Sequence, residues 1–269
     1  MYSLPGEPPL RGKVLVVIGG TSGIGISAVR AFGSAGARVV GVGLAPMPEL
    51  PTDASQAVRW IEADARLPET APAAIRQAEE CFGGFHGLYH VAGGSGRKWG
   101  DGPLHGITDE GWAATLGLNL TSVMYSNRAA VRYWLEKGQG GTILNLGSVL
   151  AASPSPGFFS THTYATAKAG IEGFTKACAA YYAPHNIRVN VLAPGLTATP
   201  MSQRAQNDPA ITAFLKTKQP LDGGRMGVPE DLDAIAVYFM SDFSRYVTGQ
   251  VLAVDGGWSV TEGQIPKQP

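Results

Sequence analysis

The stretch Lys13-Val-Leu-Val-Val-Ile-Gly19-Gly-Thr-Ser-Gly23-Ile-Gly25 decides the fold of this chain. It begins with a short apolar run rich in β-branched residues, which is typical of a buried strand. Glycines follow at once, and residues 27–34 are compatible with a helix. Such glycines let the backbone approach a pyrophosphate, whose charge the helix N-terminus would hold. The stretch predicts a strand, a dinucleotide-binding loop and a helix, although a glycine-rich turn alone is a weak signal.

The rest of the chain repeats this alternation of strand and helix. Further β-segments are expected at 38–42, 58–61, 88–91, 141–146, 186–192 and 250–257. Helices are expected at 68–81, from the cap Thr108 to about Lys137, from Tyr164 to about Ala183, and from Pro229 onward. Seven β-segments alternating with helices predict an α/β fold, a single-domain, doubly wound (Rossmann-type), seven-stranded parallel sheet with helices on both faces.

The predicted domain covers residues 13–260, between an N-terminal extension at 1–12 and a C-terminal tail at 261–269. Inside it, the polar, Pro-interrupted region at about 195–227 is expected to form short helices. We interpret this region as a flap over the substrate that excludes water.

Composition limits the possible partners. Of 269 residues, 44% are hydrophobic and 16% charged, and Lys+Arg and Asp+Glu are equal at 21 each. This balance gives no electrostatic footprint for nucleic acid or for an anionic membrane. The partner is expected to be a small molecule or another copy of the chain.

Cysteine usage and the N-terminus favour a cytoplasmic protein. Cys81 and Cys178 are far apart and belong to no Cys/His cluster, so neither a disulfide framework nor a metal site is expected. The N-terminus lacks the layout of a secretory signal, and no apolar run approaches the length of a membrane span.

Several residues near predicted strand ends have two interpretations. The second strand ends in Gly43-Leu44, where an Asp or Glu would bind a ribose 2′-hydroxyl and an Arg would accept a 2′-phosphate. Leu44 either covers an adenine face or is a core residue. Asp64 either accepts a hydrogen bond from an adenine amino group or caps the next helix. Ala92 and Gly93 are small, which suits close backbone approach to a ligand.

The loop from Gly94 to Thr108 follows the same edge of the predicted sheet, where loops tend to shape pockets. It carries Arg97, Lys98, Trp99 and His105. We interpret these side chains as surface features rather than ligand contacts.

Tyr164-Ala-Thr-Ala-Lys168 places a phenol and an ammonium four residues apart, on one face of a predicted helix. The cation would favour the phenolate, whose usual pKa is about 10, and so suit the tyrosine to acid–base chemistry. The pair alone is more typical of a solvated helix face. Ser148, which follows a predicted strand, either binds a substrate oxygen or is a turn serine.

Taken together, these motifs resemble the short-chain dehydrogenases/reductases from about Lys13 to Gly257, and in particular their 3-oxoacyl-[acyl-carrier-protein] reductase-like members. Ile18 stands where the family's glycine signature usually has threonine, and His90-Val-Ala-Gly93 stands in place of Asn-Asn-Ala-Gly. The span from Ser148 to Tyr164 is a few residues longer than usual. The stretch from Tyr246 to Gly257 is similar to a C-terminal strand that often joins a tetramer interface.

The resemblance implies a catalytic tetrad at Asn119, Ser148, Tyr164 and Lys168. The cofactor contacts that we expect are Gly19, Thr21, Ser22, Gly23, Ile24, Gly25, Leu44, Asp64, Ala65, Ala92, Gly93, Tyr164, Lys168, Pro194, Gly195, Thr197 and Thr199. Among these, Thr197 would meet the nicotinamide amide and Thr199 the diphosphate. Asn119 would hold a water that links Lys168 to solvent.

The expected function is that of an NAD(P)-dependent oxidoreductase, a short-chain alcohol dehydrogenase or carbonyl reductase acting on a small carbonyl or alcohol substrate. The cofactor is NAD or NADP, and Leu44 favours NAD. A homo-oligomer, a dimer or tetramer, is expected. The alternative is a dinucleotide-binding sensor or scaffold without turnover, which would have no chemical need for the intact tetrad.

Overall fold

Seven parallel strands form one sheet in the order β3-β2-β1-β4-β5-β6-β7. The structure is a computed structural model that describes residues 7–44, 46–49 and 56–264. The strands are β1 (Val14–Ile18), β2 (Arg38–Gly43), β3 (Val58–Glu62), β4 (Gly87–His90), β5 (Gly141–Leu146), β6 (Ile187–Pro194) and β7 (Val251–Val254). The outer ends of the predicted extension and tail, residues 1–6 and 265–269, lie outside the described residues.

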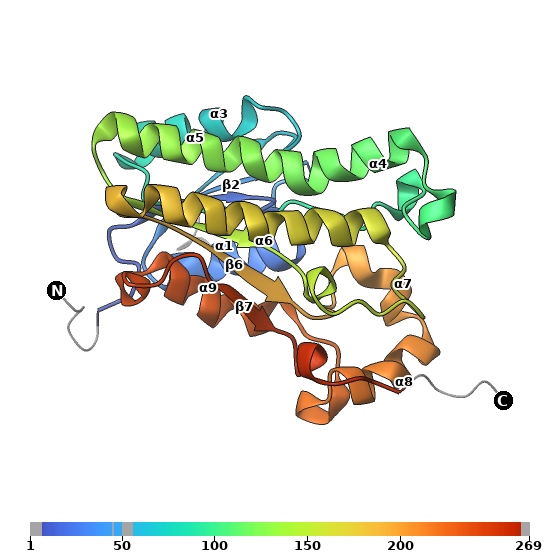
Figure 1. The fold of residues 1–269 in the computed structure, drawn as a ribbon. Coiled ribbons are helices and arrows are strands. Elements are labelled where there is room, and N and C mark those ends of the chain that lie inside the picture. The colour runs from blue at the N-terminus through green and yellow to red at the C-terminus, as the bar shows by residue number, and fades with distance from the viewer. Residues whose placement is uncertain (1–6, 45, 50–55, 265–269) are drawn as a thin grey trace.

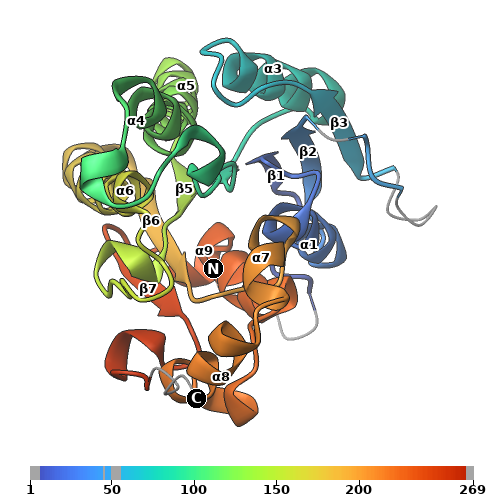
Figure 2. The same ribbon diagram turned by 90° about the vertical axis from the view of Figure 1, so that its right-hand side faces the viewer.

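Helices cover both faces of the sheet, as the alternating pattern predicts (Figures 1 and 2). One face carries α1 (Gly23–Ser34) and α9 (Asp233–Met240), whose apolar side chains share a core cluster with β1 and β2. The other face carries α3 (Thr70–Phe82), α5 (Ser122–Lys137) and α6 (His162–Tyr182). The strands are therefore buried on both sides, which explains why they read as continuous apolar runs. No helix among the described residues is long and apolar enough to cross a membrane.

The helix expected from Thr108 to Lys137 is interrupted. Thr108 caps it as predicted, because its hydroxyl accepts a hydrogen bond from the Gly111 N–H at 3.1 Å. After α4 (Asp109–Leu116), however, one π-helical segment (Gly117–Thr121) precedes α5. Such segments are frequent at functional sites. Here the segment contains the buried Asn119.

The region after β6 forms short helices, as expected for the flap. They are a 3-10 turn (Pro200–Ser202), α7 (Gln203–Gln206), α8 (Pro209–Lys218) and a second 3-10 turn (Leu221–Gly224). They lie beyond the tips of β6 and β7 (Figure 1). The buried Gln219 ties the region to the sheet, since its amide bonds both the N–H and the carbonyl of Leu196 and the carbonyl of Arg225.

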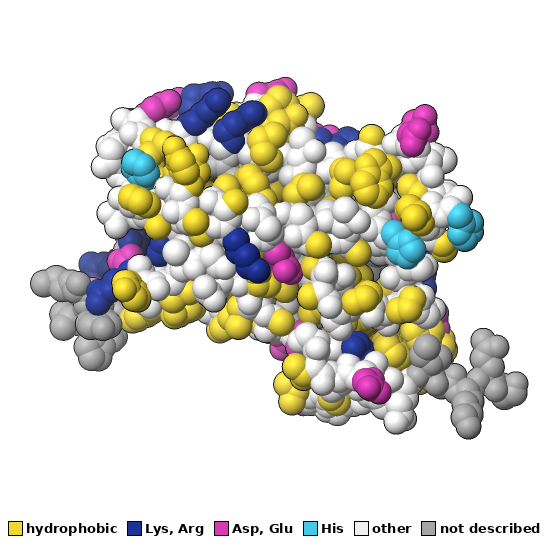
Figure 3. All heavy atoms as spheres, in the orientation of Figure 1, with side chains coloured by type: hydrophobic (Ala, Val, Ile, Leu, Met, Phe, Trp, Pro, Cys, Tyr) yellow, Lys and Arg dark blue, Asp and Glu magenta, His cyan; other side chains and the backbone are white. Residues whose placement is uncertain are grey.

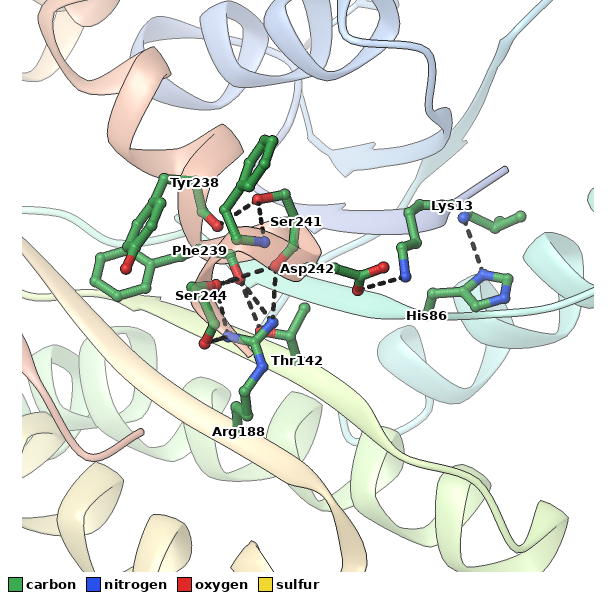
Figure 4. Close-up of polar contacts among 11 residues, drawn as sticks. Lys13, His86, Thr142, Arg188, Tyr238, Phe239, Ser241, Asp242 and Ser244 are labelled. Atoms are coloured by element: carbon green, nitrogen blue, oxygen red, sulfur yellow. Dashed lines mark hydrogen bonds and ion pairs between the residues drawn. The ribbon is translucent and has the colours of Figure 1, made fainter. Parts of the chain in front are cut away.

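At the opposite end of the sheet, Arg188 of β6 joins the end of α9 to the strand (Figure 4). Its guanidinium donates to the carbonyls of Phe239, Ser241 and Ser244 and to the Ser244 hydroxyl, at 2.7 to 3.3 Å. The carbonyls of a helix's last turn lack partners within the helix, and they attract a cation. Arg188 therefore acts as a C-terminal cap supplied by a neighbouring strand.

Candidate active site

Two adjoining cavities open at the carboxyl edge of the sheet. The glycine-loop cavity has a volume of about 360 Å³, and the tyrosine cavity, which contains Ser148 and Tyr164, about 160 Å³. Ile24, Leu146, Thr199 and Met201 line both cavities.

The predicted cofactor residues are divided between the two cavities. Gly19, Thr21, Ser22, Gly23, Leu44, Asp64, Ala65, Ala92 and Gly93 line the glycine-loop cavity, whereas Pro194, Gly195 and Thr197 line the tyrosine cavity. Gly25, Asn119 and Lys168 line neither and lie in the structure around them.

The glycine loop has the tight geometry that its sequence predicts. Gly19 has a φ of +88°, and a Cβ there would lie 2.5 Å from the Ala92 nitrogen. A Cβ at Gly25 would lie 1.9 Å from the Gly19 carbonyl oxygen. Ser22, the N-cap residue of α1, makes no side-chain capping bond, so the first N–H groups of the helix have no side-chain partner there. This arrangement suits a phosphate group.

Leu44 and Asp64 each lose one of their two interpretations. Leu44 is 63% exposed and lines the glycine-loop cavity, so the core interpretation is wrong. Asp64 does not cap the next helix, because α3 begins at Thr70 with Glu69 at its N-cap. Its carboxylate instead pairs with Arg66, with an Oδ2–Nη2 distance of 2.5 Å, and this hydrogen bond lowers the pKa of Asp64.

His90 supplies the bracing that the missing asparagines would otherwise provide. The buried imidazole lies between two serines of α5, with Nδ1 2.7 Å from the Ser126 hydroxyl and Nε2 3.2 Å from the Ser122 hydroxyl. Burial lowers the pKa of His90 to about 3, so the ring is neutral at physiological pH. Each ring nitrogen of His90 therefore links the end of β4 to α5.

Asn119 and Lys168 meet at Gly93. A Cβ at Gly93 would lie 2.9 Å from Asn119 Oδ1 and 3.5 Å from Lys168 Nζ. The Asn119 amide holds Gly94, accepting from its N–H at 3.0 Å and donating to its carbonyl at 2.9 Å. Lys168 is 2% exposed and donates to the Leu146 carbonyl at 2.7 Å. Two members of the predicted tetrad thus contact the wall of the glycine-loop cavity from behind.

Tyr164 is positioned by a residue that sequence reasoning missed. The carboxylate of the buried Asp101 accepts from the N–H groups of Thr163 and Tyr164, each at 2.9 Å, and so caps the first turn of α6. Tyr164 and Ser148, which follows β5, line the same cavity, and the Ser148 hydroxyl acts to lower the pKa of the phenol. Asp101 is 63 residues from Tyr164 in sequence, so no local pattern could have indicated it.

The expected lowering of the Tyr164 pKa by Lys168 is not found. Burial raises the pKa of Tyr164 to about 12, and only the hydrogen bond with Ser148 opposes this shift. Burial also lowers the pKa of Lys168 to about 7, so the ammonium is only partly charged near neutral pH. Its Nζ lies 5.5 Å from the centroid of the Tyr164 ring. Desolvation therefore outweighs the attraction between the two groups in this chain.

The loops around the tyrosine cavity differ from their sequence interpretation. Arg97 and Ser95 line the cavity, whereas Lys98, Trp99 and His105 do not. The surface interpretation of Arg97 is thus incomplete. In the longer loop between Ser148 and Tyr164, Phe159 lines the cavity, while Phe158 packs against Phe214 with ring centroids 5.2 Å apart. The described residues include no group of three His, Cys, Asp or Glu that could hold a metal ion.

Comparisons with known proteins agree with this geometry. Residues 19–259 match the family model described as enoyl-(acyl carrier protein) reductase. The chain is 32% identical to the 2-dehydro-3-deoxy-D-gluconate 5-dehydrogenase of Escherichia coli (strain K12), over 93% of this chain and 96% of that protein. It is 34% identical to the 3beta-hydroxysteroid dehydrogenase 1 of Eggerthella lenta, over 94% and 96%.

The fold is also similar to a solved structure of a short-chain type dehydrogenase/reductase from Mycobacterium ulcerans. The TM-score is 0.81 at 26% sequence identity, and the match covers 94% of this chain and 92% of that one. These relatives are named as dehydrogenases or reductases, which supports a catalytic protein and not the sensor or scaffold alternative. The chain therefore belongs to the short-chain dehydrogenase/reductase family and is an oxidoreductase that uses NAD or NADP.

Proposed function

We propose that Tyr164 is the general acid and base of this oxidoreductase and that Ser148 binds the reacting oxygen. The observation that carries the proposal is their joint position: both line the tyrosine cavity, which adjoins the glycine-loop cavity, and Lys168 lies behind the shared wall. In alcohol oxidation, the substrate hydroxyl gives its proton to Tyr164, while Ser148 donates a hydrogen bond to the oxygen that becomes the carbonyl. In reduction, Tyr164 returns the proton.

The residues present fit a nicotinamide dinucleotide. The glycine loop and the N-terminus of α1 would hold its diphosphate, together with Thr199, whose Cγ2 lies 3.2 Å from the position of a Cβ on Gly23. Thr197 and Lys168 would hold the nicotinamide end. When bound, the nicotinamide supplies the hydride acceptor or donor, and the protein supplies position and charge.

We propose NAD(H) rather than NADP(H). Among the described residues, no Lys or Arg side chain lines the glycine-loop cavity, and the one acid that does, Asp64, is paired with Arg66. A Cβ at Gly43 would lie 2.1 Å from the Thr21 hydroxyl oxygen, so Thr21 fills the place of the usual acidic side chain. A 2′-phosphate would therefore meet no cation in the described lining of this cavity.

We also propose a homo-oligomer, a dimer or tetramer. Apolar side chains spread across the face on which α5 and α6 lie (Figure 3), and Tyr181 of α6 is 73% exposed. On the edge strand β7, Leu252 is also exposed, and exposed edge strands are usually covered. The mass of the protein in solution, measured by light scattering, tests this. A cytoplasmic location is consistent with the two free thiols, Cys81 and Cys178.

Replacing Tyr164 by Phe tests the proposed function. The substitution removes the proton donor and keeps the ring, so turnover of carbonyl and alcohol substrates should fall by about 10²- to 10⁴-fold while NADH binding stays within about twofold. Tyr181→Phe, on the same helix but exposed, is the matched control. NADH and NADPH titrations of the wild type decide the cofactor. Retained turnover in Tyr164→Phe would exclude Tyr164 as the acid–base group.

A further inference from the structure

Two arginine side chains converge at the tyrosine cavity. Arg97 comes from the loop after β4, and Arg204 comes from α7. Both line the cavity that contains Ser148 and Tyr164. Each donates from Nη2 to the same acceptor, the carbonyl oxygen of Phe158, at 3.3 Å and 3.1 Å. The two guanidinium groups therefore lie within one hydrogen bond of a single oxygen atom, although they come from distant parts of the chain.

The two positive charges lack a carboxylate partner. In the part of the chain that the structure describes, neither Arg97 nor Arg204 forms an ion pair. The nearby Asp101 uses both carboxylate oxygens on backbone N–H groups of α6. Burial lowers the pKa of Arg97, the charge of Arg204 lowers it further, and the charge of Asp101 opposes both. The two like charges thus lie close together, and neither is paired directly with a carboxylate.

Holding the Phe158 carbonyl does not account for both arginines. The oxygen can accept from both guanidinium groups through its two lone pairs, and Arg204 also lies 5.8 Å from the centroid of the Phe159 ring, but neither contact offsets the repulsion between two like charges brought to one atom. Each guanidinium carries five N–H donors, and in each case one bond to this carbonyl is the hydrogen bond found. The remaining donors of both groups can bind an anion, and guanidinium groups match the two oxygens of a carboxylate.

The cavity itself suits a small apolar body. Its apolar lining includes Leu146, Val149, Leu150, Phe159, Leu196 and Trp258. Its volume of about 160 Å³ is close to that of an engineered apolar cavity of about 150 Å³ that binds benzene. A six-membered ring or a short branched chain would fill it, whereas a steroid skeleton would extend well beyond it.

We propose that Arg97 and Arg204 bind the carboxylate of a compact hydroxy or oxo acid, whose apolar body fills the tyrosine cavity and whose alcohol or carbonyl faces Ser148 and Tyr164. The inference rests on the proposed function for the identity of the reacting end. The charged end of the ligand rests on the arginine pair alone. The two can therefore be tested separately.

Binding of an unreactive ligand tests the arginine pair without any turnover. Cyclohexanecarboxylate and its methyl ester have the same ring, and only the acid carries a charge. With NADH present, titration calorimetry should show the acid binding at least tenfold more tightly than the ester. Trp258 lines the cavity, so a change in its fluorescence gives a second readout.

Three variants test whether the tighter binding of the acid depends on Arg97 and Arg204. Arg97→Gln and Arg204→Gln should each weaken binding of the acid about tenfold and leave the ester within twofold, because glutamine keeps a donor but loses the charge. Arg132→Gln, an exposed arginine of α5, is the control and should change neither. Added salt should weaken binding of the acid and leave binding of the ester unchanged.

Several outcomes overturn the inference. Equal affinity for the acid and the ester does so. Unchanged binding of the acid in both Arg97→Gln and Arg204→Gln does so as well. Tighter binding of cyclohexyl phosphate than of cyclohexanecarboxylate would show that the arginine pair recognises a phosphate ester rather than a carboxylate. If the acid binds as expected but Tyr164→Phe retains turnover of a hydroxy acid, the proposed function fails and the anion site stands.

Discussion

Lys168 and Arg188 are two shielded cations at opposite ends of the same sheet, and their surroundings differ. Arg188 has four acceptors, three carbonyls and a hydroxyl, at the end of α9. Lys168 has one, the Leu146 carbonyl, and burial lowers its pKa to about 7. The first site gives a guanidinium acceptors at both of its terminal nitrogens, while the second leaves a buried ammonium with two unused donors beside the cavities.

The difference separates structural from chemical use of a buried charge. A charge that is fully bonded contributes to stability and has no capacity left for a ligand. A charge that is incompletely bonded costs stability, so its presence in a folded protein indicates another role. At Lys168 the proposed function would supply that role, since Tyr164 and the glycine-loop cavity lie within reach of the side chain.

The largest expected effect is at Lys168. Lys168→Met keeps the length of the side chain and removes its charge, so turnover should fall by about 10²- to 10⁴-fold. The same variant should be more stable than the wild type at pH 6. The folded chain releases the Lys168 proton at about pH 7, whereas the unfolded chain keeps it to about pH 10.5, so burial of the charge costs stability fully below pH 7.

Denaturant unfolding at several pH values measures this effect. The stability gain of Lys168→Met should shrink as the pH rises from 7 to 9, because the wild type then folds with a neutral amine. Lys176→Met, an exposed lysine of the same helix, should change neither turnover nor the pH dependence. A Lys168→Met protein that is less stable than the wild type at pH 6 would contradict the comparison.

The next largest effect is expected at Arg188, where a substitution should lower stability and leave turnover unchanged. Arg188→Met removes the charged donor from the end of α9, where the Phe239 carbonyl keeps only the hydroxyls of Thr142 and Ser244, so the free energy of unfolding should fall by about 2–4 kcal/mol. Turnover per folded molecule should stay within about twofold, because Arg188 lies near the amino end of β6, whereas both cavities lie at the carboxyl edge of the sheet. Arg188→Lys should recover part of the stability, and Arg132→Met should lose little. A specific loss of turnover at full stability would show that this end of the sheet communicates with the active site.

The sequence predicts the sheet and most of the site because both follow from local patterns. Apolar runs, glycine spacing and the Tyr164–Lys168 pair lie within single elements, and the order of elements restricts the topology. The residues that position the site depend instead on contacts between distant segments. Asp101 caps α6 from a loop, His90 replaces an asparagine through two serines of α5, and the Arg188 cap reaches across to α9.

The pKa values show the same limit of sequence reasoning. The spacing of Tyr164 and Lys168 predicts a Coulomb attraction, and it contains no information on burial. In the folded chain, desolvation dominates both groups and shifts their pKa values toward the neutral forms. The core interpretation of Leu44 failed for a related reason, and the surface interpretation of Arg97 was incomplete, because the walls of a cavity are formed by several elements together.

The smallest expected effect concerns Asp233, a partly buried acid that lies in neither cavity. Its Oδ2 accepts from the Ser27 hydroxyl at 2.7 Å, and its buried Oδ1 has no partner among the described residues. Burial raises the pKa of Asp233 to about 6, so the folded protein carries an unfavourable charge above that pH.

If a buried charge with too few hydrogen bonds is tolerated only where catalysis uses it, the Asp233 carboxylate lowers stability and serves no catalytic purpose. Asp233→Asn should therefore raise the free energy of unfolding by about 1 kcal/mol at pH 7, after screening by solvent, and leave turnover unchanged. The gain should shrink as the pH falls below 6 and disappear only below the unfolded pKa of 3.8, where the wild-type carboxyl is protonated in both the folded and the unfolded chain. A loss of turnover in Asp233→Asn would instead mean that an incompletely bonded charge marks function here too, and that the site extends to the α1–α9 face of the sheet.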